Sequence, residues 1–226
     1  MKTGAEGQDV RDELKEEIRK AIAEGRKVQE AVRSITLKAL TGRELDQAAI
    51  AKVTREVLDA VREAAEARGD SAAKPASSQP VRDAVEGLDK ALAQAAQALK
   101  LSLEEASGRA GKFTHEDLAK ARGDLATLER MFLDTLRDTA RATRGAAADI
   151  LEDLARHARV SGTALGRQLE QASPLAGGLA HAGRVQFEAG LSAATASGAM
   201  LARIASGVLA GIADALATPR HKNPPH

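Results

Sequence analysis

Apolar side chains recur every three or four residues along most of this 226-residue chain. That spacing places them on one face of an α-helix and leaves the polar residues on the opposite face. The stripes run through residues 10–22, 28–39, 50–64, 81–99 and 118–169. The pattern therefore predicts an all-α protein. We expect an elongated helical bundle with coiled-coil-like long helices and an Ala/Gly-rich helix at the C-terminus.

Prolines, glycines and shifts in composition divide the chain. We expect an N-terminal charged helical segment over 1–72, a flexible linker over 73–80, long amphipathic helices over 81–173, a small-residue-rich apolar helical segment over 175–218 and a disordered tail over 219–226. The linker contains two prolines, which disfavour the interior of a helix. An unbroken helix over 115–171 would be roughly 85 Å long. The alternative is a break near Gly145 or Gly162.

The composition is poor in the residues that build catalytic and binding sites. The chain has no Cys, Trp or Tyr and three Phe, while its 33 basic and 32 acidic residues alternate along the helical stretches. Such alternation is typical of solvated helix faces with ion pairs between successive turns. The histidines lack metal-ligand spacing, and no aromatic platforms accompany the basic residues. We expect no enzyme, no catalytic residue, no metal, no cofactor, no small-molecule substrate and no nucleic-acid partner.

The end of the chain differs from the rest in charge. Residues 175–226 contain four basic and two acidic residues. On a helical wheel, one apolar face of this segment collects Leu201, Ile204, Val208, Ile212 and Leu216, while Ser192, Arg203, Ser206 and Asp214 fall roughly opposite. We expect this face to bind a partner or to lie at a lipid interface.

The same segment also carries a row of small residues. Gly190, Ala194, Gly198, Ala202, Ser206 and Ala210 follow at intervals of four, Gly207 and Gly211 form a second pair, and Gly162 and Gly166 repeat the spacing earlier in the chain. Small residues at this spacing allow two helix backbones to approach closely. The row predicts close helix packing, either inside the chain's own bundle, between copies of the chain, or at a membrane.

Two Ala-rich amphipathic stretches carry a family resemblance. Residues 89–107 read DKALAQAAQALKLSLEEAS, and residues 146–158 read AAADILEDLARHA. With the absence of Cys, these stretches resemble the phasins, helical proteins that coat polyester storage granules in bacteria. The resemblance covers most of residues 81–217 and implies a granule coat. Stress-related proteins of the late-embryogenesis-abundant kind are similar in composition, but they lack an apolar end.

These observations leave three functional hypotheses from different classes. In the first, the chain is a non-enzymatic protein that binds a storage granule, a membrane or an exposed protein surface through residues 175–218. The second is a homo-oligomeric scaffold or adaptor that packs through the row of small residues. The third is a pore-forming helical protein, against which the central Arg203 counts. The chain begins without an apolar signal stretch. We therefore expect it in the cytoplasm, peripheral to a granule or membrane when it is bound.

Overall fold

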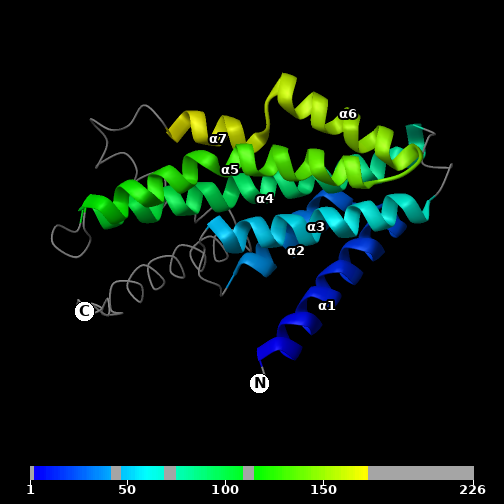
Figure 1. Cartoon of the computed structure of the whole chain (residues 1–226), viewed down its shortest axis with the longest axis horizontal. Helices are drawn as coiled ribbons and strands as arrows, with labels where there is room; N and C mark the ends of the chain where they lie inside the picture. The colour runs from blue at the N-terminus through cyan, green and yellow to red at the C-terminus, as the bar shows by residue number, and fades with distance from the viewer. Residues whose placement is uncertain (1–2, 42–46, 69–74, 109–114, 173–226) are drawn as a thin grey trace, which may run out of the picture.

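The structure is a computed structural model that describes residues 3–41, 47–68, 75–108 and 115–172. These residues form seven α-helices: α1 (Thr3–Glu24), α2 (Val28–Leu40), α3 (Gln47–Ala67), α4 (Pro75–Gly108), α5 (His115–Ala142), α6 (Ala146–Ser161) and α7 (Ala164–Ala172). Figure 1 shows α3, α4 and α5 running along the long axis of the molecule, with α6 and α7 together along one side. The predicted all-α fold is confirmed, and the helices pack as a bundle.

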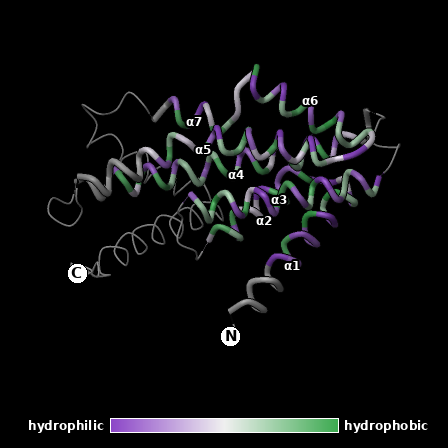
Figure 2. The backbone as a smooth tube through the Cα atoms, viewed as in Figure 1, coloured by the Kyte–Doolittle hydropathy of each residue, from purple (hydrophilic) through white to green (hydrophobic). Residues whose placement is uncertain are grey.

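The stripes predicted from the sequence form one continuous hydrophobic core. Its largest fully buried side chains are Phe132, Ile18, Ile22, Leu40, Ile50, Leu58, Leu88, Leu92, Leu136, Leu151 and Leu165. Figure 2 shows the hydrophobic residues distributed as short patches along every helix, as amphipathic packing requires. Two threonines of the 118–169 stripe, Thr139 and Thr143, are also buried. Each hydroxyl donates to the carbonyl four residues earlier, so neither buried group is left unpaired.

The helix α4 is the central helix of the bundle. It contacts α2, α3, α5 and α7, and between residues 78 and 104 its exposed side chains are Gln79, Glu86, Lys90, Gln97 and Glu104. A helix that is covered on several sides needs small side chains where its neighbours cross it. Ala84, Ala91, Ala95, Ala96 and Ala98 are buried at such positions. The alanine content of this stretch is therefore explained by packing inside the chain.

One close approach in this packing is between α2 and α4 at Gly87. A Cβ atom added to Gly87 would lie 2.5 Å from the carbonyl oxygen of Gln29 and 3.2 Å from the backbone nitrogen of Arg33. Both are backbone atoms of α2, so neither can rotate out of the way. The absence of a side chain at Gly87 thus sets the distance between the two helices.

Substituting Gly87 with alanine is therefore expected to destabilise the protein, although alanine is the better helix former. Overpacking of this kind lowers the free energy of unfolding by about 1–3 kcal/mol. The matched control is Gly123→Ala in α5, where no atom lies within 4 Å of the added Cβ. That change should raise the free energy of unfolding by up to about 1 kcal/mol. Urea unfolding of both variants tests the contrast, and a stabilised Gly87→Ala protein would contradict it.

The predicted linker over 73–80 is wrong for residues 75–80, which form the first turns of α4. Pro75 is the first residue of the helix, where its missing N–H loses no hydrogen bond. Pro80 lies inside the helix and is buried. Its Cγ would be 3.7 Å from a Cβ on Gly25, so the ring packs against the turn between α1 and α2. Tertiary packing at this point outweighs the local preference of proline.

The stripe over 115–171 is divided at both of the glycines that the sequence singles out. Gly145 and Gly162 adopt φ values of 63° and 75°, a left-handed region that favours glycine. These residues separate α5, α6 and α7. Figure 1 shows α6 folded back along α5, and the stripe therefore packs partly against itself. The single helix of roughly 85 Å is replaced by three shorter ones.

Candidate functional site

The surface-binding face and the row of small residues predicted at the C-terminal end lie outside the described residues, which stop at residue 172. This holds for Leu201, Ile204, Val208, Ile212 and Leu216, and for Gly190, Ala194, Gly198, Ala202, Ser206, Gly207 and Gly211. Both therefore stay predictions. Within the part of the chain that the structure describes, none of the helices has the length and apolar character needed to cross a membrane. The same residues contain no group of three or more potential metal ligands.

The most highly organised polar site is at the start of α7, where α4, α5 and α7 meet. We call Asp89, Glu129, Thr163 and Gly166 the α7 junction. The carboxylate of Asp89 accepts hydrogen bonds from the backbone N–H groups of Ala164 at 2.6 Å and Leu165 at 3.0 Å. A side chain from α4 thereby satisfies two of the free N–H groups at the beginning of another helix.

The second half of the junction involves Thr163 and α5. The Thr163 hydroxyl donates to Oε1 of Glu129 at 2.7 Å and accepts from the backbone N–H of Gly166 at 2.7 Å. A Cβ atom on Gly166 would collide with the Glu129 carboxylate. The pair Gly162 and Gly166 was predicted to form a close helix contact. That prediction is wrong, because Gly162 lies in the turn before α7 and Gly166 makes room for a carboxylate.

The junction and a buried leucine together hold the short helix α7 in place. A nine-residue helix is only marginally stable alone in water. Leu165 is fully buried and stabilises the docked helix by about 1.5–3 kcal/mol, and a helix cap of this kind typically contributes about 1 kcal/mol. The α7 junction therefore fixes the position from which the chain continues into residues 173–226.

Burial raises the pKa of Asp89 above its ordinary value of 3.8, and the nearby carboxylate of Glu129 acts in the same direction. The N–H groups of Ala164 and Leu165 and the charge of Arg167 oppose this effect, but burial is the largest influence on the pKa. The native protein therefore binds the Asp89 proton more tightly than the unfolded chain does. Above pH 3.8, stability falls as the pH rises through the raised pKa of Asp89.

The predicted fall of stability with rising pH can be tested with Asp89→Asn, which removes the titrating group and keeps the size of the side chain. The free energy of unfolding of the native sequence, minus that of the variant, is expected to decrease as the pH rises from about 4 to about 7. Urea titrations of both proteins at each pH provide the two values. A difference that increases with pH would mean that the docked carboxylate has a lowered pKa.

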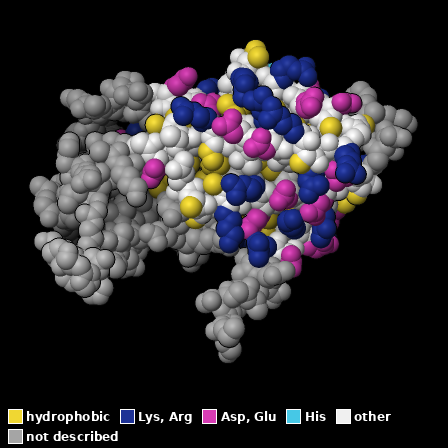
Figure 3. Space-filling view, in the orientation of Figure 1, with side chains coloured by type: hydrophobic (Ala, Val, Ile, Leu, Met, Phe, Trp, Pro, Cys, Tyr) yellow, Lys and Arg dark blue, Asp and Glu magenta, His cyan; other side chains and the backbone are white. Residues whose placement is uncertain are grey.

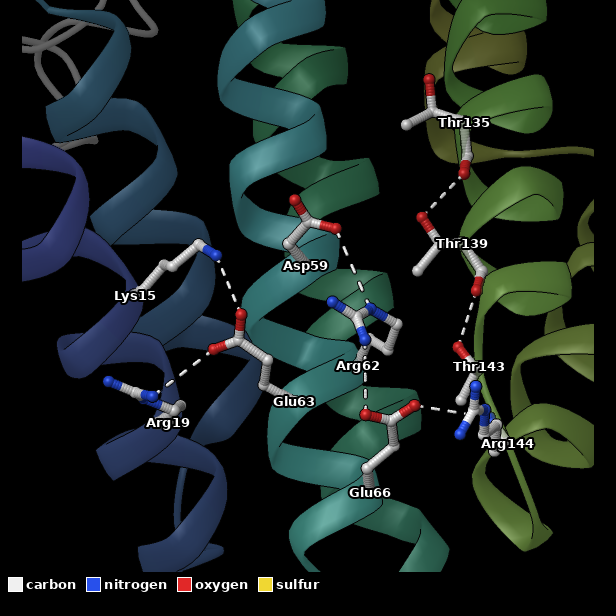
Figure 4. A network of polar contacts seen from close by, with 10 residues as sticks. All are labelled: Lys15, Arg19, Asp59, Arg62, Glu63, Glu66, Thr135, Thr139, Thr143 and Arg144. Carbon is white, nitrogen blue, oxygen red and sulfur yellow. Dashed lines mark hydrogen bonds and ion pairs between the residues drawn. The ribbon is translucent and has the colours of Figure 1, made fainter. Parts of the chain in front are cut away.

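A second polar network connects α1, α3 and the turn that follows α5, and is drawn in Figure 4. Glu63 of α3 is contacted by Lys15 Nζ at 2.9 Å and by Arg19 at 3.4 Å, both from α1. One turn further along α3, Glu66 accepts from Arg62 and from the backbone N–H of Arg144. Partly exposed ion pairs of this kind contribute little stability individually. The network joins α1 to α3, and α3 to the turn between α5 and α6.

One arrangement on α6 has the residue types of a nucleophilic site. Asp153, His157 and Ser161 follow at intervals of four residues, and Ser161 Oγ lies 3.4 Å from Nδ1 of His157. The Arg82 guanidinium bonds to Asp153 at 2.9 Å and holds the pKa of that carboxyl below its usual range. Ser161 ends the helix, where the carbonyl groups carry partial negative charge. A developing oxyanion would be repelled there, so the geometry does not favour acyl transfer.

The described part of the chain is thus an all-α helical bundle, and the polar contacts described above join its helices. The chain belongs to a protein family described as a family of unknown function, DUF6781, whose model matches residues 5–218. The match includes the segment 175–218 and ends before the tail. No curated protein and no solved structure matches the chain.

Proposed function

We propose that this protein is a non-enzymatic coat protein that binds a hydrophobic surface through residues 175–218. The surface is that of a storage granule, a membrane or an exposed protein. In this proposal the bundle formed by residues 3–172 stays in the aqueous phase of the cytoplasm and covers the bound surface. The resemblance to phasins agrees with this assignment.

The observation that carries the proposal is the difference between the bundle and the segment that follows it. The bundle packs its large apolar residues into its own core. Among the described residues, Val160 is the one large hydrophobic side chain that is exposed. Charged side chains of both signs cover the face of the bundle seen in Figure 3. A surface of this composition favours contact with water.

The segment 175–218 has the opposite character. It holds two basic residues, Arg184 and Arg203, and two acidic residues, Glu188 and Asp214. Its predicted apolar face is broad enough to lie along an interface, while its small residues give the opposite side only weak polarity. The family model extends across this segment, so the segment is part of the unit that defines the family.

A homo-oligomeric scaffold is the second candidate, for which the contact that Gly87 makes inside the chain serves as a precedent. This glycine lies within a row of small residues, Gly87, Ala91 and Ala95, and permits a close contact between α2 and α4. The longer row at 190–210 has the same spacing and would allow a similar contact between copies of the chain. The full chain would then form oligomers in lipid-free buffer. A monomer by light scattering would contradict this candidate.

The two candidates are separated by flotation of the purified protein with apolar droplets and with liposomes of phosphatidylcholine, which carry no net charge. The full chain is compared with a truncation to residues 1–174, whose helicity is checked by circular dichroism. The coat proposal predicts that the full chain floats and that the truncation stays at the bottom of the gradient. If both proteins float, binding resides in the bundle and the proposal fails. If neither floats, the scaffold becomes the better explanation.

A further inference from the structure

The end of α6 has an unusual combination of charge and exposure. Residues 154–169 contain three arginines and one histidine and no acidic residue. Arg156, His157, Arg159, Val160 and Ser161 are all exposed at the end of α6, and we call these five residues the α6 tip. Arg167 is exposed just beyond it, in the first turns of α7. Figure 1 shows this end of α6 rising away from α5.

Val160 is the second feature of the tip. It is 81% exposed and is the one exposed large hydrophobic residue among the described residues. Figure 3 shows dark blue Lys and Arg side chains gathered over α6, beside acidic side chains, with yellow hydrophobic atoms at the top of this face. An apolar side chain surrounded by cationic ones is suited to a surface that presents negative charge above an apolar layer.

The helix dipole accounts for part of this arrangement. Asp149, Glu152 and Asp153 lie in the first half of α6 and the arginines in the second half, as the dipole favours. Asp153 also lies 3.6 Å from Arg156, whereas Arg159 has no ion pair of this kind among the described residues. The helix dipole does not explain why the apolar side chain of Val160 is exposed next to these arginines.

We propose that the α6 tip and Arg167 bind the anionic headgroups of a phospholipid surface. This inference rests on the proposed function and specifies the chemistry of the surface to which residues 175–218 attach. A guanidinium group binds phosphate oxygens in a bidentate manner, while Val160 enters the layer beneath the headgroups. The nine-residue helix α7 is the only described element between the tip and the C-terminal segment. Both parts of the chain can therefore meet the same surface.

The experiment compares two charge variants of the full chain that lose the same number of charges. The tip variant combines Arg156→Gln, Arg159→Gln and Arg167→Gln. The control combines Lys52→Gln, Arg55→Gln and Lys90→Gln, three exposed basic residues on α3 and α4. Binding is measured to vesicles of phosphatidylcholine alone and of phosphatidylcholine mixed with phosphatidylglycerol. Circular dichroism confirms that both variants keep their helix content.

The native chain is expected to bind the mixed vesicles at least tenfold more tightly than the neutral ones. The tip variant should lose most of this preference and the control should keep it, and high salt should abolish the preference in both. Val160→Asn should weaken binding to the mixed vesicles without any change in charge.

Each other result counts against the inference in a recognisable way. Equal binding of the native chain to both kinds of vesicle, or equal losses in the tip variant and the control, would overturn the inference and leave the proposed function intact. No binding to any vesicle, together with no flotation on apolar droplets, would overturn both. Arginine-dependent binding to duplex DNA without binding to vesicles would show that the tip recognises another polyanion.

Discussion

Replacing Phe132 with alanine is expected to lower the free energy of unfolding by about 3–5 kcal/mol. Phe132 lies in the middle of α5, is 1% exposed and is the largest of the fully buried side chains. The core around it consists mostly of Ala, Val, Leu and Ile, which cannot fill the space that a phenyl ring leaves. Since typical domains are stable by about 5–15 kcal/mol, the loss would be a large part of the total.

The next residue provides the matched control for this prediction. Leu133 is only partly buried at the edge of the same core, so Leu133→Ala should have a clearly smaller effect. Urea unfolding followed by circular dichroism gives both free energies of unfolding. If Phe132→Ala were no more destabilising than Leu133→Ala, the ring would not be at the centre of the folded core.

The second large effect concerns binding. Leu201→Asp and Ile212→Asp each place a carboxylate on the predicted apolar face of residues 175–218, and each is expected to abolish association with apolar droplets. Moving an ionised carboxylate from water into an apolar phase is strongly unfavourable. The helix content should change little, because the bundle formed by residues 3–172 has a core of its own. Flotation and circular dichroism measure the two quantities on the same samples.

Ser192→Asp provides the control, because Ser192 lies on the opposite side of the predicted helical wheel. This variant adds the same charge to the same segment and should still float. Unchanged flotation of both Leu201→Asp and Ile212→Asp would contradict the assigned face. Equal loss in all three variants would indicate that net charge, rather than an apolar face, controls the association.

Local periodicity was enough to predict the all-α fold and the inward faces of the helices. Ile18, Val57, Leu88 and Leu136 are all buried where the spacing of apolar residues places them. The sequence left two alternatives for residues 115–171, an unbroken helix or a break near Gly145 or Gly162, and the structure breaks at both glycines, where a left-handed backbone favours glycine. These features depend on residues that are near one another in the sequence.

Features that depend on distant contacts were not predictable in the same way. Pro80 remains helical because it packs near Gly25, a contact that no local pattern indicates. Asp89 caps a helix that begins 75 residues later, and in the sequence it looks like one more charge on an amphipathic stretch. The many alanines of α4 are only a weak sign of its central position in the bundle. Alanine is also the best helix former, so helix propensity explains these alanines without any packing.

The α6 tip was also missed, for a different reason. In the sequence, Arg156 and Arg159 continue the alternation of charges that runs through the whole chain. The structure shows that both arginines are exposed beside Val160, just before the turn at Gly162 that separates α6 from α7. A search for stretches free of acidic residues would have located it, since residues 154–169 form such a stretch.

Hydrogen exchange of the full chain, with and without apolar droplets, tests the central claim most directly. The account predicts that protection on binding increases within residues 175–218, while the amides in the cores of α4 and α5 exchange at unchanged rates. An increase of protection in α4 and α5 instead would contradict this account. Unchanged exchange rates over 175–218 in protein that had bound the droplets would contradict it as well.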